Sequence, residues 1–455
     1  MPKKKTALTI EERLQQALVP AEEQPYEVPE NWVWVRLESV ASWGSGGTPS
    51  RKHEEYYNGD ILWIKTGELN NGWIYDTEEK ITDEGLKKSS AKLFPPYSVL
   101  IAMYGATIGK VAILGVPATT NQACACAVCN QSLLYMYLFY YCISQKNVFI
   151  EKGKGGAQPN ISQIILKQHP IPLPPLSEQQ RIVERIEELF TKLDEAKERL
   201  QEVAESFAVR KAAILHKAFT GELTKQWRLE NGVSDESWEE KKLGEVGSWL
   251  GGGTPSTSRE EYWENGNILW ITSKDMKSAV IEDTLMKVNE IGVKNSSANY
   301  MEKPALLVVM RSGILRRTFP VAMVKKPFTV NQDLKAIIPD KDDLEFLFWM
   351  LLSNERRILD SCMKNGTTVE SINSNALKAF AFKCPTLPEQ HEIVRLIDDL
   401  LARERSAQQA TEQALASIDL MKKSILARAF RGELGTNKAS EASAMELLRQ
   451  VLAEG

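Results

Sequence analysis

Two long stretches of the chain place apolar residues at alternating steps of four and three positions, with charged residues between them. One stretch runs from Glu178 to Phe219 and the other from Glu389 to Phe430. This heptad pattern predicts a helix that packs along another helix. Because the register is the same in both stretches, we expect them to pair with each other as an antiparallel coiled coil. The residues expected to pair the helices are Ile182, Ile186, Leu189, Leu193, Leu200 and Phe207 in the first stretch, and Ile393, Ile397, Leu400, Ile418 and Ile425 in the second.

Polar residues interrupt both apolar seams. Arg210 occupies a seam position of the first helix, and Glu404 and Thr411 occupy two positions of the second. Polar seam residues are one way to fix the register of paired helices, and we expect that role here. At the start of the first helix, Ser177 and Gln180 have the spacing of a capping box.

The segments before the two helices have a different pattern, in which short apolar runs alternate with Gly, Pro and Asn. Such runs predict strands and turns. The same motifs occur in both segments and in the same order, so the chain is an internal duplication. The matching motifs are Gly47-Thr48-Pro49-Ser50 with Gly253-Thr254-Pro255-Ser256, Ile61-Leu62-Trp63-Ile64 with Ile268-Leu269-Trp270-Ile271, Ser89-Ser90-Ala91 with Ser296-Ser297-Ala298, Asn121-Gln122 with Asn331-Gln332, and Glu178-Gln179 with Glu389-Gln390.

These patterns predict an α+β fold with two β-rich mixed domains, separated by two long helices and related by a pseudo-two-fold repeat. We align Trp34 of the first copy with Trp238 of the second. The expected segments are an N-terminal helical arm (1–30), domain 1 (31–175), a central helical spacer (176–236), domain 2 (237–385), a C-terminal helical spacer (386–435) and a flexible tail (436–455).

Length and charge narrow the class of protein. A chain of 455 residues suits about two to four domains. Its formal net charge of −4 argues against simple electrostatic binding to nucleic acid, so a partner protein would have to supply much of any phosphate contact. No apolar run is long enough to span a membrane, and the N-terminus has no signal-peptide core. We therefore expect a cytoplasmic protein with no membrane partner.

Residues that usually carry catalysis or bind metals occur here in unsuitable arrangements. None of the four histidines has the spacing of a metal site or of a nucleophile and its base. Cys124, Cys126 and Cys129 have no visible fourth ligand, so a buried strand is the preferred interpretation. The glycine runs lead into Thr-Pro and not into a helix start, which disfavours a nucleotide site. We expect no catalytic residue, metal or cofactor in this chain.

The doubled order of motifs resembles one known family. Gly-Thr-Pro-Ser, Leu-Trp-Ile and Asn-Gln are followed by Pro-Leu-Pro-Pro-Leu-x-Glu-Gln, and then by a long helix that ends in Ala-Phe-Thr-Gly-Glu-Leu-Thr. This order is similar to that of the specificity subunit of type I restriction-modification systems, and the resemblance covers nearly the whole chain. The second copy departs from the first at Thr386-Leu387-Pro388, which affects the expected start of the second helix.

The resemblance implies a ligand and several partners. In this family each of two target recognition domains reads one half of a split sequence in double-stranded DNA. Two methyltransferase subunits bind the helices, and restriction subunits that translocate and cut DNA join that core. The resemblance places S-adenosylmethionine in the methyltransferase subunits, ATP and Mg in the restriction subunits, and no catalysis in this chain. The residues alone leave a second interpretation open, a coiled-coil scaffold with duplicated protein-binding domains that never touches DNA.

The repeat sorts the candidate DNA contacts. Residues identical in both copies cannot distinguish two different half-sites, so we expect them to hold the fold or contact phosphates. Asn-Gln pairs suit adenine, but their identity in both copies favours a structural or backbone role. Residues that differ are better candidates for base reading, although a merely solvated basic loop is an equal alternative for the arginines of domain 2. The predicted phosphate donors are Thr48, Ser50, Thr254 and Ser256. The predicted reading or close-approach residues are Lys65, Thr66, Tyr104, Thr107, Lys110 and Gln158 in domain 1, and Ser273, Lys274, Arg311, Ser312, Arg316, Arg317, Thr367 and Thr368 in domain 2.

Overall fold

The computed structural model describes residues 9–153, 160–364 and 369–454. The chain forms two compact units, and each unit contains one domain and one end of each long helix. Unit 1 comprises Met1–Leu200 and Ala414–Gly455, and unit 2 comprises Gln201–Gln413. The α+β fold class predicted from the sequence is confirmed.

Domain 1 is built on a five-stranded sheet in the order β2-β9-β6-β7-β4, beside a three-stranded sheet in the order β5-β3-β8. A separate antiparallel pair, β1 with β10, joins the entry and exit of the domain. Helix α4 packs on β6 and β7 of the larger sheet. The strands are β1 (Val33–Arg36), β2 (Ala41–Ser45), β3 (Tyr57–Ile64), β4 (Trp73–Ile74), β5 (Lys80–Ile81), β6 (Val99–Ala102), β7 (Val111–Leu114), β8 (Thr119–Thr120), β9 (Cys124–Cys129) and β10 (Pro170–Leu173). The helices are α2 (Leu37–Val40), α3 (Asp83–Lys87), α4 (Tyr135–Ser144), α5 (Lys146–Glu151) and α6 (Gln163–Lys167), with short 3₁₀ turns η2 (Glu54–Tyr56), η3 (Thr66–Glu68) and η4 (Gly105–Thr107).

Domain 2 repeats this plan with a four-stranded sheet β12-β18-β15-β16, a three-stranded sheet β14-β13-β17 and a pair β11-β19. The strand that would match β4 is reduced to an isolated bridge from Val280 to Met323. The strands are β11 (Glu239–Lys242), β12 (Gly247–Gly251), β13 (Ile268–Ile271), β14 (Lys287–Val288), β15 (Ala305–Val309), β16 (Val321–Val324), β17 (Phe328–Val330), β18 (Leu334–Pro339) and β19 (Ala381–Cys384). The helices are α9 (Glu290–Lys294), α10 (Leu344–Ser353), α11 (Glu355–Cys362) and α12 (Ser374–Lys378), with 3₁₀ turns η5 (Asp235–Ser237), η6 (Leu243–Glu245), η7 (Glu260–Tyr262) and η8 (Gly313–Arg316).

The cysteine-rich run lies on β9, as the sequence predicted. Cys124 and Cys126 face one apolar cluster of domain 1, and the alternating Ala125 and Ala127 face another. Small side chains suit this strand because both of its faces are buried. Burial raises the pKa of the Cys126 thiol to about 12, which keeps this side chain protonated and chemically inert.

The two long helices are α7 (Leu176–Phe219) and α13 (Leu387–Phe430), each of 44 residues. In unit 1, Lys422 contacts Asp194 at 2.5 Å, and in unit 2, Arg210 contacts Glu404 at 2.8 Å. In unit 1 the start of α7 shares a core cluster with the end of α13, and in unit 2 the end of α7 shares one with the start of α13, so the helices run antiparallel within each unit. The two charged interruptions of the seams therefore meet each other. The buried Thr411 donates its hydroxyl hydrogen bond to the Ala407 carbonyl one turn earlier.

The seam residues near the start of each helix are buried in the domain cores. Ile182 and Ile186 belong to the core cluster of unit 1, and Ile393 and Ile397 belong to that of unit 2. The first turns of each helix thus fasten it to its own domain. Of the other predicted pairing residues, Phe207 and Ile418 are buried, and Leu189, Leu193, Leu200, Leu400 and Ile425 are half-buried.

Three sequence expectations were wrong. The first is the capping box of α7: the Ser177 hydroxyl donates to Glu441 at 3.1 Å, and Gln180 contacts Glu184. Helix α7 begins at Leu176 directly after two prolines, and its first amide donors bond to the Pro175 carbonyl. The departure at Thr386 leaves this arrangement unchanged, because α13 also begins at a leucine and uses the Thr386 carbonyl in the same way.

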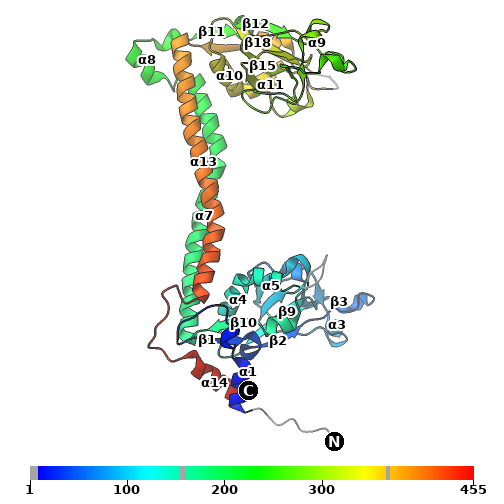
Figure 1. The fold of residues 1–455 in the computed structure, drawn as a ribbon, viewed down its shortest axis with the longest axis vertical. Helices are drawn as coiled ribbons and strands as arrows, with labels where there is room; N and C mark the ends of the chain where they lie inside the picture. Colours follow the sequence, from blue (N-terminus) through cyan, green and yellow to red (C-terminus); the bar gives the residue numbers. More distant parts are fainter. Residues whose placement is uncertain (1–8, 154–159, 365–368, 455) are drawn as a thin grey trace. The chain divides into compact units, whose positions relative to one another are not determined.

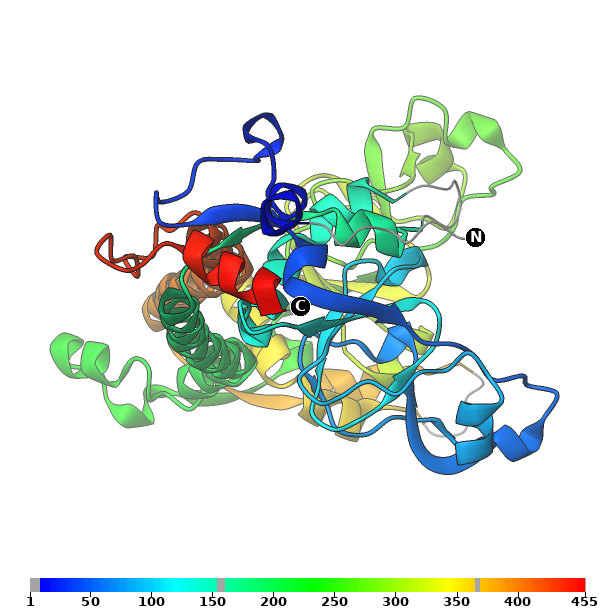
Figure 2. The same cartoon turned by 90° about the horizontal axis from the view of Figure 1, so that it is seen from below.

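The second correction concerns residues 436–455, which are not a flexible tail in the described part. Helix α14 (Ala444–Glu454) packs beside helix α1 (Ile10–Ala17), and both lie against domain 1 (Figure 1, Figure 2). Ala444 and Leu448 are fully buried in the core of unit 1, and Arg13 donates to the Leu452 carbonyl at 3.1 Å. The amphipathic pattern of this helix finds its apolar partner within the same unit.

The third correction concerns the tryptophans. Leu37 donates its backbone N–H to the His169 carbonyl, and Leu243 donates in the same way to Phe380. These matched contacts make Leu243 the equivalent of Leu37, which is 206 positions earlier in the chain. The equivalent of Trp238 is therefore Trp32 and not Trp34.

Candidate functional site

The repeated motifs converge on one loop of each domain. In domain 1, the Trp63 indole donates to the Gly47 carbonyl at 2.9 Å, and in domain 2, the Trp270 indole donates to Gly253 at 3.2 Å. Each contact ties the Leu-Trp-Ile strand to the Gly-Thr-Pro-Ser loop. The tryptophans are thus part of the frame that holds this loop.

The glycines of these loops are required by close approach of the backbone. A Cβ atom at Gly46 would lie 1.8 Å from the Thr120 carbonyl oxygen, and one at Gly252 would lie 1.8 Å from that of Val330. Any side chain there would push the loop away from β8 or β17. The lack of space for a side chain explains these glycines, so no phosphate-binding site is needed to account for them.

The loop threonines are bound by the repeated glutamines. The Thr48 hydroxyl donates to Gln122 Oε1 at 2.5 Å, and the Thr254 hydroxyl donates to Gln332 Oε1 at 2.8 Å. All four side chains are exposed. Because the hydroxyl proton points to the glutamine, each glutamine amide nitrogen is left to donate outward. The glutamine is therefore the better donor to a ligand than the threonine predicted for that role.

The Asn-Gln turn links three of the predicted segments. In domain 1, Asn121 donates its backbone N–H to Ile64, which precedes Lys65, and Met103, which precedes Tyr104, donates to Ala123. The Asn121 carboxamide oxygen accepts from the Ala123 N–H and shapes the turn itself. The same contacts in domain 2 join Asn331 to Ile271, Met310 to Asp333, and the Asn331 carboxamide oxygen to the Asp333 N–H.

A second pair of loops meets beside this turn. The segment after β6 forms a bridge between Tyr104 and Asn160, and the segment after β15 forms one between Arg311 and Ser371. The loops whose sequences differ between the two copies therefore lie together within each domain. The predicted residues Gln158, Thr367 and Thr368 fall outside the described residues.

The basic residues of these loops differ in their availability. Arg316 forms an ion pair with Glu370, whereas Arg311 and Arg317 are exposed and have no ion pair within the described parts of the chain. Lys65 contacts Glu79 at 2.9 Å and Glu78 at 3.3 Å, and these hydrogen bonds raise its pKa. Arg311 and Arg317 are thus better placed than Lys65 or Arg316 to contact an anionic ligand.

The remaining predicted residues have different surroundings. Lys274 and Ser273 border a cleft of about 420 Å³ in domain 2, which Asn331 and Asp333 also line. The Ser312 hydroxyl accepts the Ile314 N–H at 3.5 Å, and the Thr107 hydroxyl donates to the Tyr104 carbonyl at 2.7 Å. Of the others, Ser50 and Ser256 are exposed, and Thr66 and Lys110 are half-buried.

Known proteins are similar to this chain in both sequence and fold. Residues 29–205 and 235–415 each match the model of the type I restriction modification DNA specificity domain. The chain belongs to this family. It is 40% identical to the EcoR124I/EcoR124II specificity subunit of Escherichia coli over 161 residues, which are 35% of this chain and 40% of that protein. It is 25% identical to the EcoKI specificity subunit of E. coli K12 over 458 residues, covering 94% of this chain and 96% of that protein. The crystal structure of the HsdS subunit from Thermoanaerobacter tengcongensis matches with a TM-score of 0.66 at 20% identity, over 90% of this chain and 100% of that one.

Each specificity domain is fastened to the long helices by a buried glutamate that sequence reasoning missed. In unit 1, Glu178 accepts from the Trp32 indole at 2.7 Å, from Asn437 at 2.9 Å and from Thr436 at 3.3 Å. Burial raises the pKa of this carboxyl, which the three donors oppose. The glutamate thus joins the start of α7 to the segment that follows α13. The Glu-Gln motif was recognised, but its buried position could not be read from a polar pair in a helix start.

The corresponding glutamate of unit 2 has a charged partner. Glu389 accepts from Arg228 and from Thr224, each at 2.7 Å, and joins the start of α13 to helix α8 (Lys225–Asn231). Arg228 and Glu389 are both buried. Trp238 Nε1 and Glu389 Oε2 have no hydrogen-bond partner in the described structure, although the matching pair in unit 1 is bonded.

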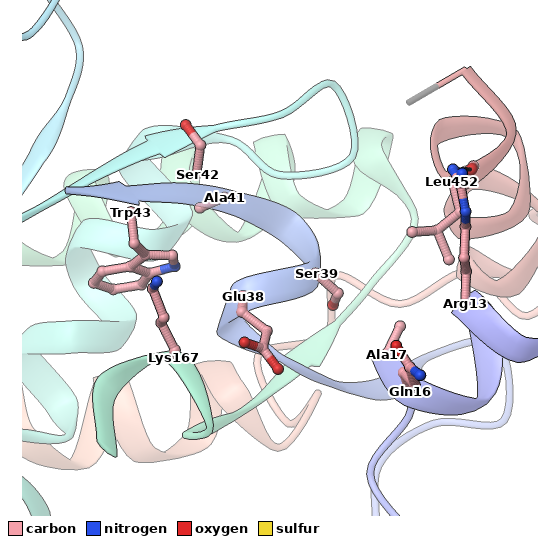
Figure 3. Close-up of a pocket in the computed structure, with 10 residues that line it drawn as sticks. All are labelled: Arg13, Gln16, Ala17, Glu38, Ser39, Ala41, Ser42, Trp43, Lys167 and Leu452. Atoms are coloured by element: carbon pink, nitrogen blue, oxygen red, sulfur yellow. Dashed lines mark hydrogen bonds between the residues drawn. The ribbon is translucent and has the colours of Figure 1, made fainter. Parts of the chain in front are cut away.

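Unit 1 also has a cleft of about 380 Å³, lined by domain 1 together with α1 and α14, that contains none of the predicted recognition residues (Figure 3). Lys167 extends toward the Trp43 ring in its lining. In the second domain, Lys378 lies 5.4 Å from the centroid of Trp249 in the same way. The same two residue types therefore occur at equivalent positions of both specificity domains. The described residues contain no cluster of histidine, cysteine and carboxylate side chains that could hold a metal ion, and none of the described helices is long and apolar enough to cross a membrane.

Proposed function

We propose that this chain is the DNA-reading specificity subunit of a type I restriction-modification complex, with each specificity domain contacting one half of a bipartite target. The observation that carries the proposal is the convergence of loops in each domain. Loops that are identical in both copies form a shared frame, and loops that differ lie directly beside them. A frame common to both domains suits contacts with the DNA backbone, and the variable loops suit different bases.

The chain acts in this proposal without catalysis of its own. Its partners are two methyltransferase subunits, which would bring S-adenosylmethionine, and restriction subunits, which would use ATP and Mg. The paired helices α7 and α13 provide the docking surface for these partners. Family membership does not favour the alternative of a scaffold that never contacts DNA.

Substitution of Arg311 tests the proposal. Its exposed guanidinium has the forked geometry that reads guanine, so Arg311→Ala should cost about 1 to 3 kcal/mol at one half-site and relax the sequence preference there. The measurement is the methylation pattern of host DNA produced by the complex with its methyltransferase subunits. Arg316→Ala is the matched control, because that side chain is already held by Glu370.

Two outcomes would count against the proposal. Equal weakening on all sequences after Arg311→Ala would exclude base reading by this residue. A wild-type complex that methylates DNA without any sequence preference would exclude the function itself.

A further inference from the structure

Unit 1 contains a basic cleft outside the predicted recognition loops. It has a volume of about 620 Å³ and lies between the start of α5 and the last turns of α13. Its charged lining residues are Lys146, Lys423 and Arg431, and none of the lining residues is a carboxylate. All three cations are exposed. A cleft whose charged lining residues are all basic favours the binding of an anion.

The three cations are available for a ligand. Within the described residues none of them forms an ion pair, which distinguishes them from Lys65 and Arg316. The Arg431 guanidinium lies 5.2 Å from the centroid of the Tyr26 ring, which orients it at the edge of the cleft. Burial raises the pKa of Tyr26 to about 12, so its hydroxyl stays protonated and can donate a hydrogen bond.

The cleft adjoins a predicted recognition loop. Gly109 belongs to the loop that follows Tyr104 and has a φ of +74°, and a Cβ atom there would lie 3.0 Å from Lys146 Cγ. The loop backbone therefore rests on Lys146. Asn71 lines the cleft with a φ of 59° and bonds to Val111, which directly follows the loop. A DNA strand in contact with the loop would have the cleft as its neighbour.

Unit 2 lacks this charge at the equivalent positions. Glu355 starts α11 where Lys146 starts α5, and it accepts the Phe319 N–H at 2.7 Å. The repeat places Ala212 at the position of Lys423, and Thr220 at the position of Arg431. The basic cleft is therefore a property of one copy and not of the shared frame.

We propose that this cleft binds a phosphate group of the DNA backbone next to the half-site read by domain 1. This inference rests on the proposed function, since it takes DNA to be the ligand of the adjacent loop. Lysine and arginine contacts to phosphates add affinity without reading sequence. The two half-sites would then be held by unequal numbers of backbone contacts.

The test uses the chain assembled with its methyltransferase subunits and a duplex that contains the target sequence. Lys423→Ala and Arg431→Thr introduce the residues that the other copy already has, and Lys146→Ala completes the variant. We expect the affinity for target and for unrelated duplexes to fall by a similar factor, about tenfold at low salt. The slope of log affinity against log salt should decrease by about 0.9 for each phosphate that the variant no longer binds. Lys303→Ala with Lys341→Ala and Lys383→Ala, three exposed lysines of domain 2, is the control for the loss of three positive charges and should leave the affinity for the first half-site unchanged.

Several results would overturn the inference. Unchanged affinity and salt slope would show that the cleft does not touch DNA. Loss of methyltransferase subunits from the purified complex would identify an acidic protein surface as the occupant. If AMP binds wild type and not the variant while DNA affinity is equal, the phosphate comes from a free nucleotide. Any of these, with sequence-specific methylation by the wild type intact, would leave the proposed function standing.

Discussion

Domains 1 and 2 share a frame but stabilise it with different chemistry. Both copies hold the Gly-Thr-Pro-Ser loop with a tryptophan and a glutamine, and both bury a glutamate at the start of a long helix. The glutamate of unit 1 accepts from neutral donors only, whereas that of unit 2 accepts from one charged arginine and one threonine. The comparison separates what the fold needs, a bonded carboxylate, from how each copy provides it.

Arg228→Ala gives the largest expected difference between the two units. Removal of the arginine would leave Glu389 buried without its charged partner, which should destabilise unit 2 by about 3 to 5 kcal/mol. Asn437→Ala in unit 1 is the matched variant and should cost less, about 1.5 to 3 kcal/mol, because two other donors to Glu178 remain. Hydrogen exchange of peptides from the starts of α7 and α13 measures each unit separately. If both variants destabilised their units equally, the charged donor in unit 2 would matter no more than a neutral donor in unit 1.

A buried histidine gives the next difference. His169 and Phe380 occupy equivalent positions, and both side chains are buried. Burial lowers the pKa of His169 to about 3, and its Nε2 atom has no partner in the described structure. Its pKa in the unfolded chain is about 6.5, so the unfolded state gains a proton first as the pH falls. Unit 1 should therefore lose stability between about pH 6.5 and pH 3, by up to a few kcal/mol.

His169→Phe copies the residue of domain 2 and tests this directly. The variant should be more stable than wild type by about 1 to 3 kcal/mol near neutral pH, because the unpaired N–H is removed. Its domain 1 peptides should also show less acceleration of hydrogen exchange, corrected for intrinsic rates, between pH 7 and pH 5. An unchanged pH profile would mean that another group controls acid stability.

The glutamines of the shared frame give the smallest expected effect, and the same one in both domains. Gln122→Ala and Gln332→Ala should each weaken DNA binding by about 0.5 to 1.5 kcal/mol, because each would lose one hydrogen bond from an exposed, uncharged amide to the DNA backbone. The affinities for target and unrelated duplexes should fall equally, whereas Arg311→Ala should affect mainly the target. Competition binding with the two duplexes measures the ratio of these affinities. A change of preference at one half-site only would assign base reading to these glutamines.

The sequence predicted the elements that depend on local pattern. Heptads fixed the length and register of the helices, and alternating apolar runs fixed the strands, because these periods are set by a single element. The repeat also separated frame from variable loops, which the structure brings together around the Asn-Gln turn. What escaped prediction depends on contacts between distant residues. The burial of Glu178 needs Trp32 and Asn437, the order of α14 needs α1, and the pairing of Thr48 with Gln122 needs two loops to meet.

The ion pair between Arg210 and Glu404 also affects which helices of two neighbouring molecules can pair with each other. In the register set by this pair, an antiparallel pairing of two α7 helices from different chains would put Arg210 opposite Leu193, because Leu193 is the counterpart of Glu404 in the repeat. A pairing of two α13 helices would likewise put Glu404 opposite Met421. Both mismatches would place a charge against an apolar side chain, whereas pairing of α7 with α13 brings the two charges together. A duplicated sequence risks pairing like helices from two molecules, and this one polar contact in an apolar seam disfavours both of those pairings.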